Sequence, residues 1–179
     1  DQTLEKIKTI FKGRIKNLKK VAEEYYKELH KHAIVKGDDK DNWFDIKRLE
    51  NGETLIKIFN IKEGEKGKKI FEKSFNKKIT KEIWIYGLDD DDVFNVTGVK
   101  NNIIRLRIIG GQNNDVYNIE NGYKVTLYDF KSKKNTFNTN QGKKHLIDDY
   151  TLNTHAYKRL KYQRNQIIPL IGANPDDGL

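Results

Sequence analysis

The sequence predicts a mainly β protein with an N-terminal helix, in which an antiparallel β meander precedes a short parallel β-solenoid or β-roll-like repeat. Three observations lead to this prediction. Apolar residues recur every three or four positions at the start of the chain, and every second position from Asp41. From Ile85 onward, two segments align at a constant offset of 23 residues. We divide the chain into an amphipathic helix (1–36), a meander (37–82), repeats that form one compact domain with the preceding parts (83–149), and an extended tail (150–179).

Composition narrows the class of protein. The chain has 179 residues, a formal net charge of +9, and neither cysteine nor methionine. This length suits one domain with a substantial core. Without cysteine there is no disulfide framework, zinc–thiolate site or thiol nucleophile, and no apolar run approaches the roughly 18 residues of a transmembrane helix. Because the sequence starts at Asp1 and has no signal peptide, we expect it to be a fragment or processed product of a larger protein.

Residues 3–32 have the pattern of an amphipathic helix. Apolar residues from Leu4 to Leu29 recur at steps of three and four, and lysines fill the opposite face. A basic amphipathic helix can lie on an anionic membrane surface. This polar face also carries four glutamates, however, and tyrosines dominate the end of the helix. We therefore expect its apolar stripe to dock on the rest of the protein.

The meander follows from three alternating runs separated by two turns. The turns contain Gly52, and Gly64 with Gly67. Glycine-containing turns between runs of period two are hairpin signals. The runs cover 43–46, 54–59 and 70–75. No residue in this section has a catalytic pattern.

The repeat places residues 85–96 over 108–119 without a gap. The matched pairs include Gly87 with Gly110, Asp92 with Asp115, Phe94 with Tyr117, and Asn95 with Asn118. A weaker third copy, one residue longer, covers 127–138. Units of about this length stack so that each covers the apolar face of its neighbour. This periodicity predicts a parallel β-solenoid of two or three turns.

The glycine-rich turn also suggests a metal site. Residues 110–118 match the nonapeptide of calcium-binding β-rolls, with Asn113 in place of the third glycine. Stacking would bring oxygen ligands of the kind that Ca²⁺ prefers to neighbouring turns. The predicted ligands are Asp90, Asp92, Asn113 and Asp115, and no other cofactor is predicted. The alternative is that these aspartates only accept hydrogen bonds from turn amides.

Three segments occur in an order that resembles a known family: 86–94, 107–117 and 171–179. With the helix end at 22–26 and the stretch 36–44, they resemble part of large outer-membrane proteins of Bacteroidetes. Those proteins carry an N-terminal calcineurin-like metallophosphoesterase domain and end in a surface-antigen-type β-barrel. The resemblance implies a segment between these two domains, on the periplasmic side of the outer membrane or at the cell surface. The family pattern has glycines where Leu88 and Asn113 stand.

No catalytic residue is predicted. A metallophosphoesterase holds two metals with a set of aspartates, histidines and an asparagine. The four histidines of this chain, His30, His32, His145 and His155, do not occur in such motifs. His30 and His32 lie two apart on the expected helix and point about 200° away from each other. The phosphoesterase implied by the resemblance therefore lies outside this chain.

We expect a non-catalytic envelope module that links or presents parts of a larger outer-membrane protein. One alternative is a polyanion- or nucleic-acid-binding domain that uses lysine-rich flanks. The charge distribution disfavours it, because residues 83–130 carry four basic and seven acidic residues between basic ends. The other alternative is a hydrolase that uses the Asp89–Asp92 cluster. The expected partner is the rest of the parent polypeptide. We expect a monomer that binds no nucleic acid and meets a membrane only through the barrel beyond Leu179.

Overall fold

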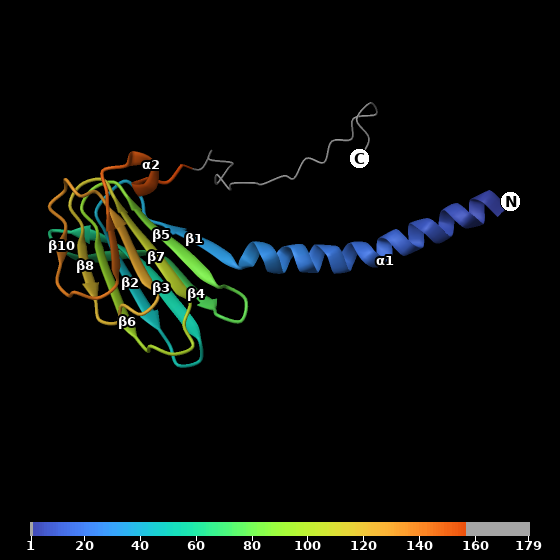
Figure 1. Ribbon diagram of the computed structural model, residues 1–179, viewed down its shortest axis with the longest axis horizontal. Helices are drawn as coiled ribbons and strands as arrows, with labels where there is room; N and C mark the ends of the chain where they lie inside the picture. The colour runs from blue at the N-terminus through green and yellow to red at the C-terminus, as the bar shows by residue number, and fades with distance from the viewer. Residues whose placement is uncertain (1, 157–179) are drawn as a thin grey trace, which may run out of the picture.

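The computed structural model describes residues 2–156, which form a β body of two sheets and a long helix that stands away from it (Figure 1). The helices are α1 (Gln2–His30) and α2 (Tyr150–Asn153). The strands are β1 (His32–Lys36), β2 (Asn42–Arg48), β3 (Glu53–Lys62), β4 (Glu65–Asn76), β5 (Glu82–Leu88), β6 (Val93–Gly98), β7 (Arg105–Gly111), β8 (Val116–Ile119), β9 (Val125–Asp129), β10 (Thr136–Phe137) and β11 (Lys143–Leu146). The chain is mainly β with an N-terminal helix, as predicted.

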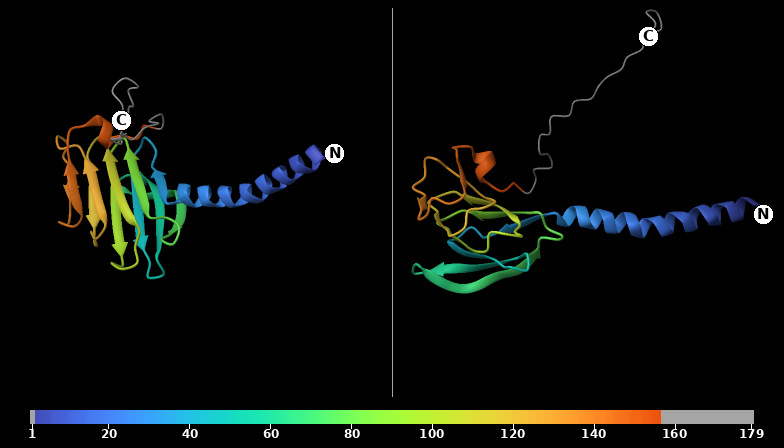
Figure 2. Two further views of the ribbon diagram at one scale, coloured as in Figure 1. Left: turned by 45° about the vertical axis from the view of Figure 1, so that its right-hand side comes forward. Right: turned by 60° about the horizontal axis from the view of Figure 1, so that its bottom comes forward.

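The strands form two sheets, and from β4 onward successive strands alternate between them. The first sheet has the order β1-β5-β7-β9-β11 and is parallel throughout. The second has the order β10-β8-β6-β2-β3-β4, parallel from β10 to β2 and antiparallel from β2 to β4. Figure 2 shows the parallel strands side by side. One strand of the first sheet, the turn after it and the next strand of the second sheet make up what we call a repeat unit.

The pairing register matches the sequence repeat. In the first sheet Glu82 pairs with Arg105, and in the second Phe94 pairs with Tyr117, both at the predicted offset of 23. The third copy is also present: Leu127 pairs with Ile108. The alignment of β5–β6, β7–β8 and β9–β10 as stacked units was therefore predicted correctly.

A further unit was missed. Strands β1 and β2 stack on β5 and β6 with a constant offset of 50, so that His32 pairs with Glu82 and Phe44 with Phe94. The hairpin β3–β4 follows β2 before the chain returns to the first sheet. Because this insertion changes the offset from 23 to 50, the first unit does not share the period of the others.

The core lies between the sheets and repeats from unit to unit. The rings of the second sheet stack with nearly parallel planes and centroid distances of 4.6, 5.2 and 4.9 Å. The stack consists of Phe44, Phe94, Tyr117 and Phe137. Aliphatic residues of both sheets cover it: Ile46, Ile83, Ile85, Val96, Leu106, Ile108, Ile119, Val125 and Leu127. Burial of each large side chain contributes about 1.5–3 kcal/mol, and stacked rings add about 0.5–1.5 kcal/mol per pair.

An amide ladder runs along the second sheet. The side-chain amide of Asn95 donates to Asp45 (3.2 Å), that of Asn118 to Asn95 (2.6 Å), and that of Asn138 to Asn118 (2.6 Å). Identical polar residues at equivalent positions of stacked strands form such ladders. The ladder favours the register that the core also selects.

The predicted antiparallel meander is present in β2, β3 and β4. It is not separate from the repeats, because β2 pairs with β3 on one side and with β6 on the other. The boundary predicted near residue 82 therefore divides a continuous sheet. Alternating apolar residues could not reveal this, since a strand has the same period whether its neighbour is parallel or antiparallel.

Two predictions about the helix were wrong. The amphipathic segment was expected to reach residue 36, but α1 ends at His30 and residues 32–36 form β1. No residue of α1 is buried, and the helix projects from the β body instead of docking on it (Figures 1 and 2). Only Lys31 separates α1 from β1, which is an edge strand, so the helix leaves the body at the edge of a sheet.

The start of the predicted extended tail contains the short helix α2. Asp149 caps it, because its carboxylate accepts the N–H of Thr151 at 2.7 Å. Positions 157–179, where the remainder of the tail was predicted, lie outside the described residues.

Candidate functional site

The turns that lead from the first sheet to the second share one construction. The first three units pass a glycine, Gly37, Gly87 or Gly110, and the fourth has Asp129 at this position. A polar turn follows in each unit. The residue just before or at the start of the second strand is Asn42, Asp92, Asp115 or Asn135. We call these four residues the inner ladder. Asn42, Asp92 and Asp115 are buried, and Asn135 is half-buried.

Side chains of the inner ladder accept backbone hydrogen bonds in one direction. The Oδ1 atom of Asp92 accepts the N–H of Asn42 at 2.8 Å. Asp115 accepts the N–H of Asp92 at 2.9 Å, and Asn135 accepts the N–H of Asp115 at 2.8 Å. Asp92, Asp115 and Asn135 thus each satisfy an amide of the preceding unit, whereas Asn42 in the first unit accepts the N–H of Asp38 in its own turn.

The residues immediately before the inner ladder make the opposite connection. Asp91 donates its N–H to the carboxylate of Asp41 (3.0 Å), and Asn114 donates to that of Asp91 (3.0 Å). Lys134 donates its N–H to the side chain of Asn114 (2.9 Å). Two rows of side chains therefore tie the turns together in both directions.

The glycines provide room for the buried carboxyls. A Cβ on Gly87 would lie 2.0 Å from Oδ2 of Asp92. A Cβ on Gly110 would lie 2.1 Å from Oδ2 of Asp115 and 2.3 Å from the hydroxyl of Tyr117. All three distances are shorter than a nonbonded contact allows, so a side chain at Gly87 or Gly110 would displace these atoms.

Burial changes the protonation of the ladder carboxyls. It raises the pKa of Asp92 to about 9, with a further contribution from the charge of Asp115. It raises the pKa of Asp115 to about 8, helped by the neighbouring Asp129. Both carboxyls therefore carry a proton at neutral pH. A neutral carboxyl resembles the amide of Asn135, which makes the same hydrogen bond at the end of the ladder.

Asp129 belongs to the same buried group. It stands where Gly110 stands one unit earlier, and its Oδ2 atom accepts the hydroxyl of Tyr117 at 2.6 Å. Burial raises its pKa, although the hydrogen bond from Tyr117 opposes the rise. Burial also raises the pKa of Tyr117 itself, so the phenol keeps its proton and acts as the donor.

The structure separates the four predicted calcium ligands. Asp92 and Asp115 are buried, whereas Asp90 is exposed and Asn113 is half-buried. The amide of Asn113 contacts the carboxylates of Asp89 and Asp90, both at 3.3 Å. Within residues 2–156, no three acidic or histidine side chains converge on a point where a metal could sit. Asn113 adopts a φ of 69°, a conformation that asparagine tolerates better than most residues, so it can stand in place of the glycine of the nonapeptide.

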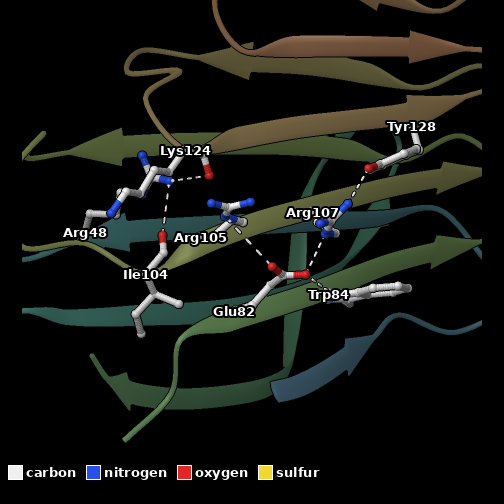
Figure 3. Close-up of polar contacts among 8 residues, drawn as sticks. All are labelled: Arg48, Glu82, Trp84, Ile104, Arg105, Arg107, Lys124 and Tyr128. Carbon is white, nitrogen blue, oxygen red and sulfur yellow. Dashed lines mark hydrogen bonds and ion pairs between the residues drawn. The ribbon is translucent and has the colours of Figure 1, made fainter. Parts of the chain in front are cut away.

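A second polar cluster, missed by the sequence reading, lies on the first sheet (Figure 3). Glu82 accepts hydrogen bonds from Arg107 (2.5 Å) and from the indole of Trp84 (2.6 Å), and it lies 3.9 Å from Arg105. Arg107 donates to the hydroxyl of Tyr128 at 2.5 Å. Burial opposes ionisation of Glu82, but its bonds and charge interaction with Arg107 outweigh burial and lower the pKa. The repeat offset of 23 between Glu82 and Arg105 could have predicted that these two residues lie side by side on adjacent strands.

Arg48 lies at the end of β2, at the opposite end of the second-sheet strands from the inner ladder (Figure 3). Its side chain is buried, and its guanidinium donates to the carbonyls of Tyr123 (2.8 Å) and Asn121 (3.2 Å). Figure 3 shows its longer contacts, with the carbonyls of Ile104 and Lys124 at 3.5 Å. Burial lowers the pKa of Arg48 to about 10, which leaves it charged at neutral pH. It holds carbonyls at this corner, among them that of Lys124, which also accepts the N–H of Leu106 at 2.9 Å.

The hollows among residues 2–156 differ in volume, from about 150 to about 510 Å³. The one nearest the predicted metal turn has a volume of about 150 Å³ and is lined in part by Asp89, Gln112 and His155. Partial burial lowers the pKa of His155, and its ring contacts the edge of Tyr86. This volume is below the range of about 300–1,000 Å³ typical of small-molecule sites.

Comparison with known protein families, curated proteins and solved structures finds no match to this chain. The resemblance to the Bacteroidetes outer-membrane segment therefore stays a prediction. Neither of the two helices in residues 2–156 combines the length and apolar character needed to cross a bilayer.

Proposed function

We propose that this chain is a non-catalytic structural module, built as a short parallel β-solenoid that carries a projecting helix. The observation that carries the proposal is the inner ladder. Its buried acidic side chains accept backbone amides of the preceding unit and are neutral at pH 7. Groups arranged in this way support the stacking of units and do not face a substrate.

The hydrolase alternative conflicts with the same geometry. A pair of catalytic carboxyls must converge on a cleft that admits substrate and water. Asp92 and Asp115 are fully buried, and Asp91 has its carboxylate on the N–H of Asn114. This arrangement leaves the aspartate cluster with a structural role.

The polyanion-binding alternative is also not favoured. On the exposed hairpin β3–β4, Lys66 pairs with Asp45 at 2.6 Å, and both Lys57 and Lys69 pair with Glu72. Because these three lysines share two carboxylates, part of their charge is neutralised, which weakens their attraction to a phosphate backbone. We expect no salt-sensitive shift of the melting temperature with heparin, and a shift that disappears at high salt would revive this alternative.

The envelope role rests on the resemblance alone. We propose that the module links or presents parts of a larger outer-membrane protein, on the periplasmic side or at the cell surface. Antibodies against the chain should label the outer-membrane fraction of the source cells. Protease treatment of intact cells would then distinguish the two sides, and recovery in the cytoplasmic fraction would contradict the envelope placement.

Deletion of one repeat unit tests the architecture. Removing residues 82–104 deletes one offset of 23 and would let β7 stack on β1 and β8 on β2. We expect this variant to unfold cooperatively, because units of a solenoid contact only their neighbours. Removing 82–103 is the matched control, because it deletes one residue fewer than the repeat offset. If β7 then pairs with β1 one residue out of register, its apolar side chains turn outward. If both deletions fail to fold, or both fold equally well, the solenoid proposal is wrong.

Absence of catalysis has its own test. The full chain is incubated with chromogenic phosphate, carboxylic ester and glycoside substrates, beside the variant Asp92→Asn. We expect no turnover above background from either protein. Turnover by the parent that is lost in Asp92→Asn would establish the hydrolase instead.

A further inference from the structure

Helix α1 exposes a continuous apolar stripe along its whole length. Its large members are about half exposed or more, from 46% for Ile7 to 66% for Leu18. Eight of its members form the row Leu4, Ile7, Phe11, Ile15, Leu18, Ala22, Tyr26 and Leu29, and Ile10, Val21 and Tyr25 lie along one side of this row. Within residues 2–156 no side chain covers it, since α1 has no buried residue. A surface of this size and apolar content marks an interaction site.

The row has a symmetric spacing, which bears on the choice of partner. Its steps of three, four, four, three, four, four and three are the same when read from either end. Reversal of the helix therefore places Leu4 on Leu29 and Ile15 on Leu18. In a two-fold interface residue i meets j while j meets i, which requires a self-complementary surface of this kind. We propose that two copies of this chain pair through antiparallel α1 helices.

Charge favours the same orientation. Residues 2–16 carry five basic residues and one acidic residue, whereas residues 17–30 carry three of each, counting histidine as neutral. A parallel pair would bring the two positively charged halves together. An antiparallel pair places each positive half beside a neutral half that contains Glu23, Glu24 and Glu28. Flanking charges select helix orientation in this way in coiled coils.

The base of the helix provides room for the end of the partner. A groove of about 510 Å³ runs beside the last turns of α1 and is lined in part by Ala22, Tyr26 and Ile79. Ile79 is exposed on the β body, so the apolar surface continues from the helix onto the body. In the antiparallel register the first turns of the partner helix, with Leu4 and Ile7, reach this groove.

The inference replaces the expectation of a monomer and does not depend on the proposed structural role. Light scattering after size exclusion measures the mass of the full chain as its concentration is raised. We expect a dimer for the parent and a monomer for Leu18→Glu, which places a charge at the centre of the stripe. Thr9→Glu adds the same charge on the opposite face and should remain a dimer. Circular dichroism establishes that both variants keep the β body.

Cross-linking tests the orientation, because the chain has no cysteine of its own. In the antiparallel pair, a mixture of Leu4→Cys and Leu29→Cys forms a mixed disulfide. Either variant alone stays largely uncross-linked, since equivalent residues lie about 37 Å apart at 1.5 Å per residue. Cross-linking of each variant with itself would overturn the antiparallel register. If the parent chain remains monomeric at every concentration, the proposed pairing is wrong. The pairing is also wrong if the chain stays a monomer and sediments with vesicles of anionic lipid.

Discussion

The helix and the β body of this protein both carry regularly spaced apolar residues, but only the β body buries them. In the β body, apolar side chains of one unit cover those of the next, and the rings from Phe44 to Phe137 form a continuous stack. In α1, an apolar stripe of similar regularity has no cover within residues 2–156. Repetition alone therefore does not bury a surface. In the β body the apolar face of one unit is buried because the next unit of the same chain packs against it.

Removal of one ring from the stack should give the largest difference between the two regions. Phe94 is fully buried between Phe44 and Tyr117. We expect Phe94→Ala to lower the free energy of unfolding by about 4 kcal/mol, from lost burial and a cavity. Phe11→Ala, the matched change on the exposed helix, should alter the unfolding of the β body by less than about 0.5 kcal/mol. Chemical denaturation followed by tryptophan fluorescence measures both, and similar losses would mean that α1 docks on the body.

Addition of one methyl group tests the close approach at Gly110. In Gly110→Ala the new Cβ would meet the polar atoms of Asp115, Tyr117 and Asp129. We expect a loss of about 3 kcal/mol in the free energy of unfolding, because well-packed polar atoms must move apart. The same denaturation experiment measures it. A loss below about 0.5 kcal/mol would show that the ladder is loosely packed.

The buried carboxyls should make the β body less stable in alkaline solution. Folding raises the pKa of Asp92 to about 9 and that of Asp115 to about 8, whereas both lie near 4 in the unfolded chain. The folded state therefore binds more protons between these limits. Their contribution to stability is complete below about pH 4 and decreases as the pH rises towards 8–9.

Asp92→Asn isolates this effect. The amide keeps the acceptor for Asn42 and cannot ionise, so we expect a gain of about 2 kcal/mol at pH 8 and a flatter dependence of the melting temperature on pH. Asp90→Asn changes an exposed carboxyl and serves as the control, with the pH dependence of the parent. If Asp92→Asn and Asp90→Asn have the same dependence, the buried carboxyl is not protonated in the folded protein.

The smallest expected effect lies in the helix. A Cβ on Gly13 would meet no atom within 4 Å, and alanine is better than glycine inside a helix by about 1 kcal/mol. Gly13→Ala should raise the helical signal in circular dichroism and leave the unfolding of the β body unchanged. A lower helical signal would contradict the continuous helix from Gln2 to His30.

The sequence allowed prediction of the stacked units because the same residue types recur at fixed positions. Gly87, Asp92 and Asn95 have direct counterparts 23 residues later. The first unit escaped notice because the inserted hairpin changes the offset, although Asn42 and Phe44 occupy the same places as Asp92 and Phe94. The calcium ligands stay a prediction, although the structure divides the four residues between the interior and the surface. Sequence spacing shows which oxygens are close along the chain, but not whether they turn towards the core or towards water.

The hairpin β3–β4 shows where this architecture can accept new sequence. It enters between two units without changing how β1 and β2 align with β5 and β6. The turn that follows each strand of the second sheet can thus accept an insertion. The length of this turn can vary while the pairing of the stacked strands stays the same. Foreign loops grafted after β6 or β8 would inherit a rigid base, and natural relatives would be free to diversify their outer surface at these corners.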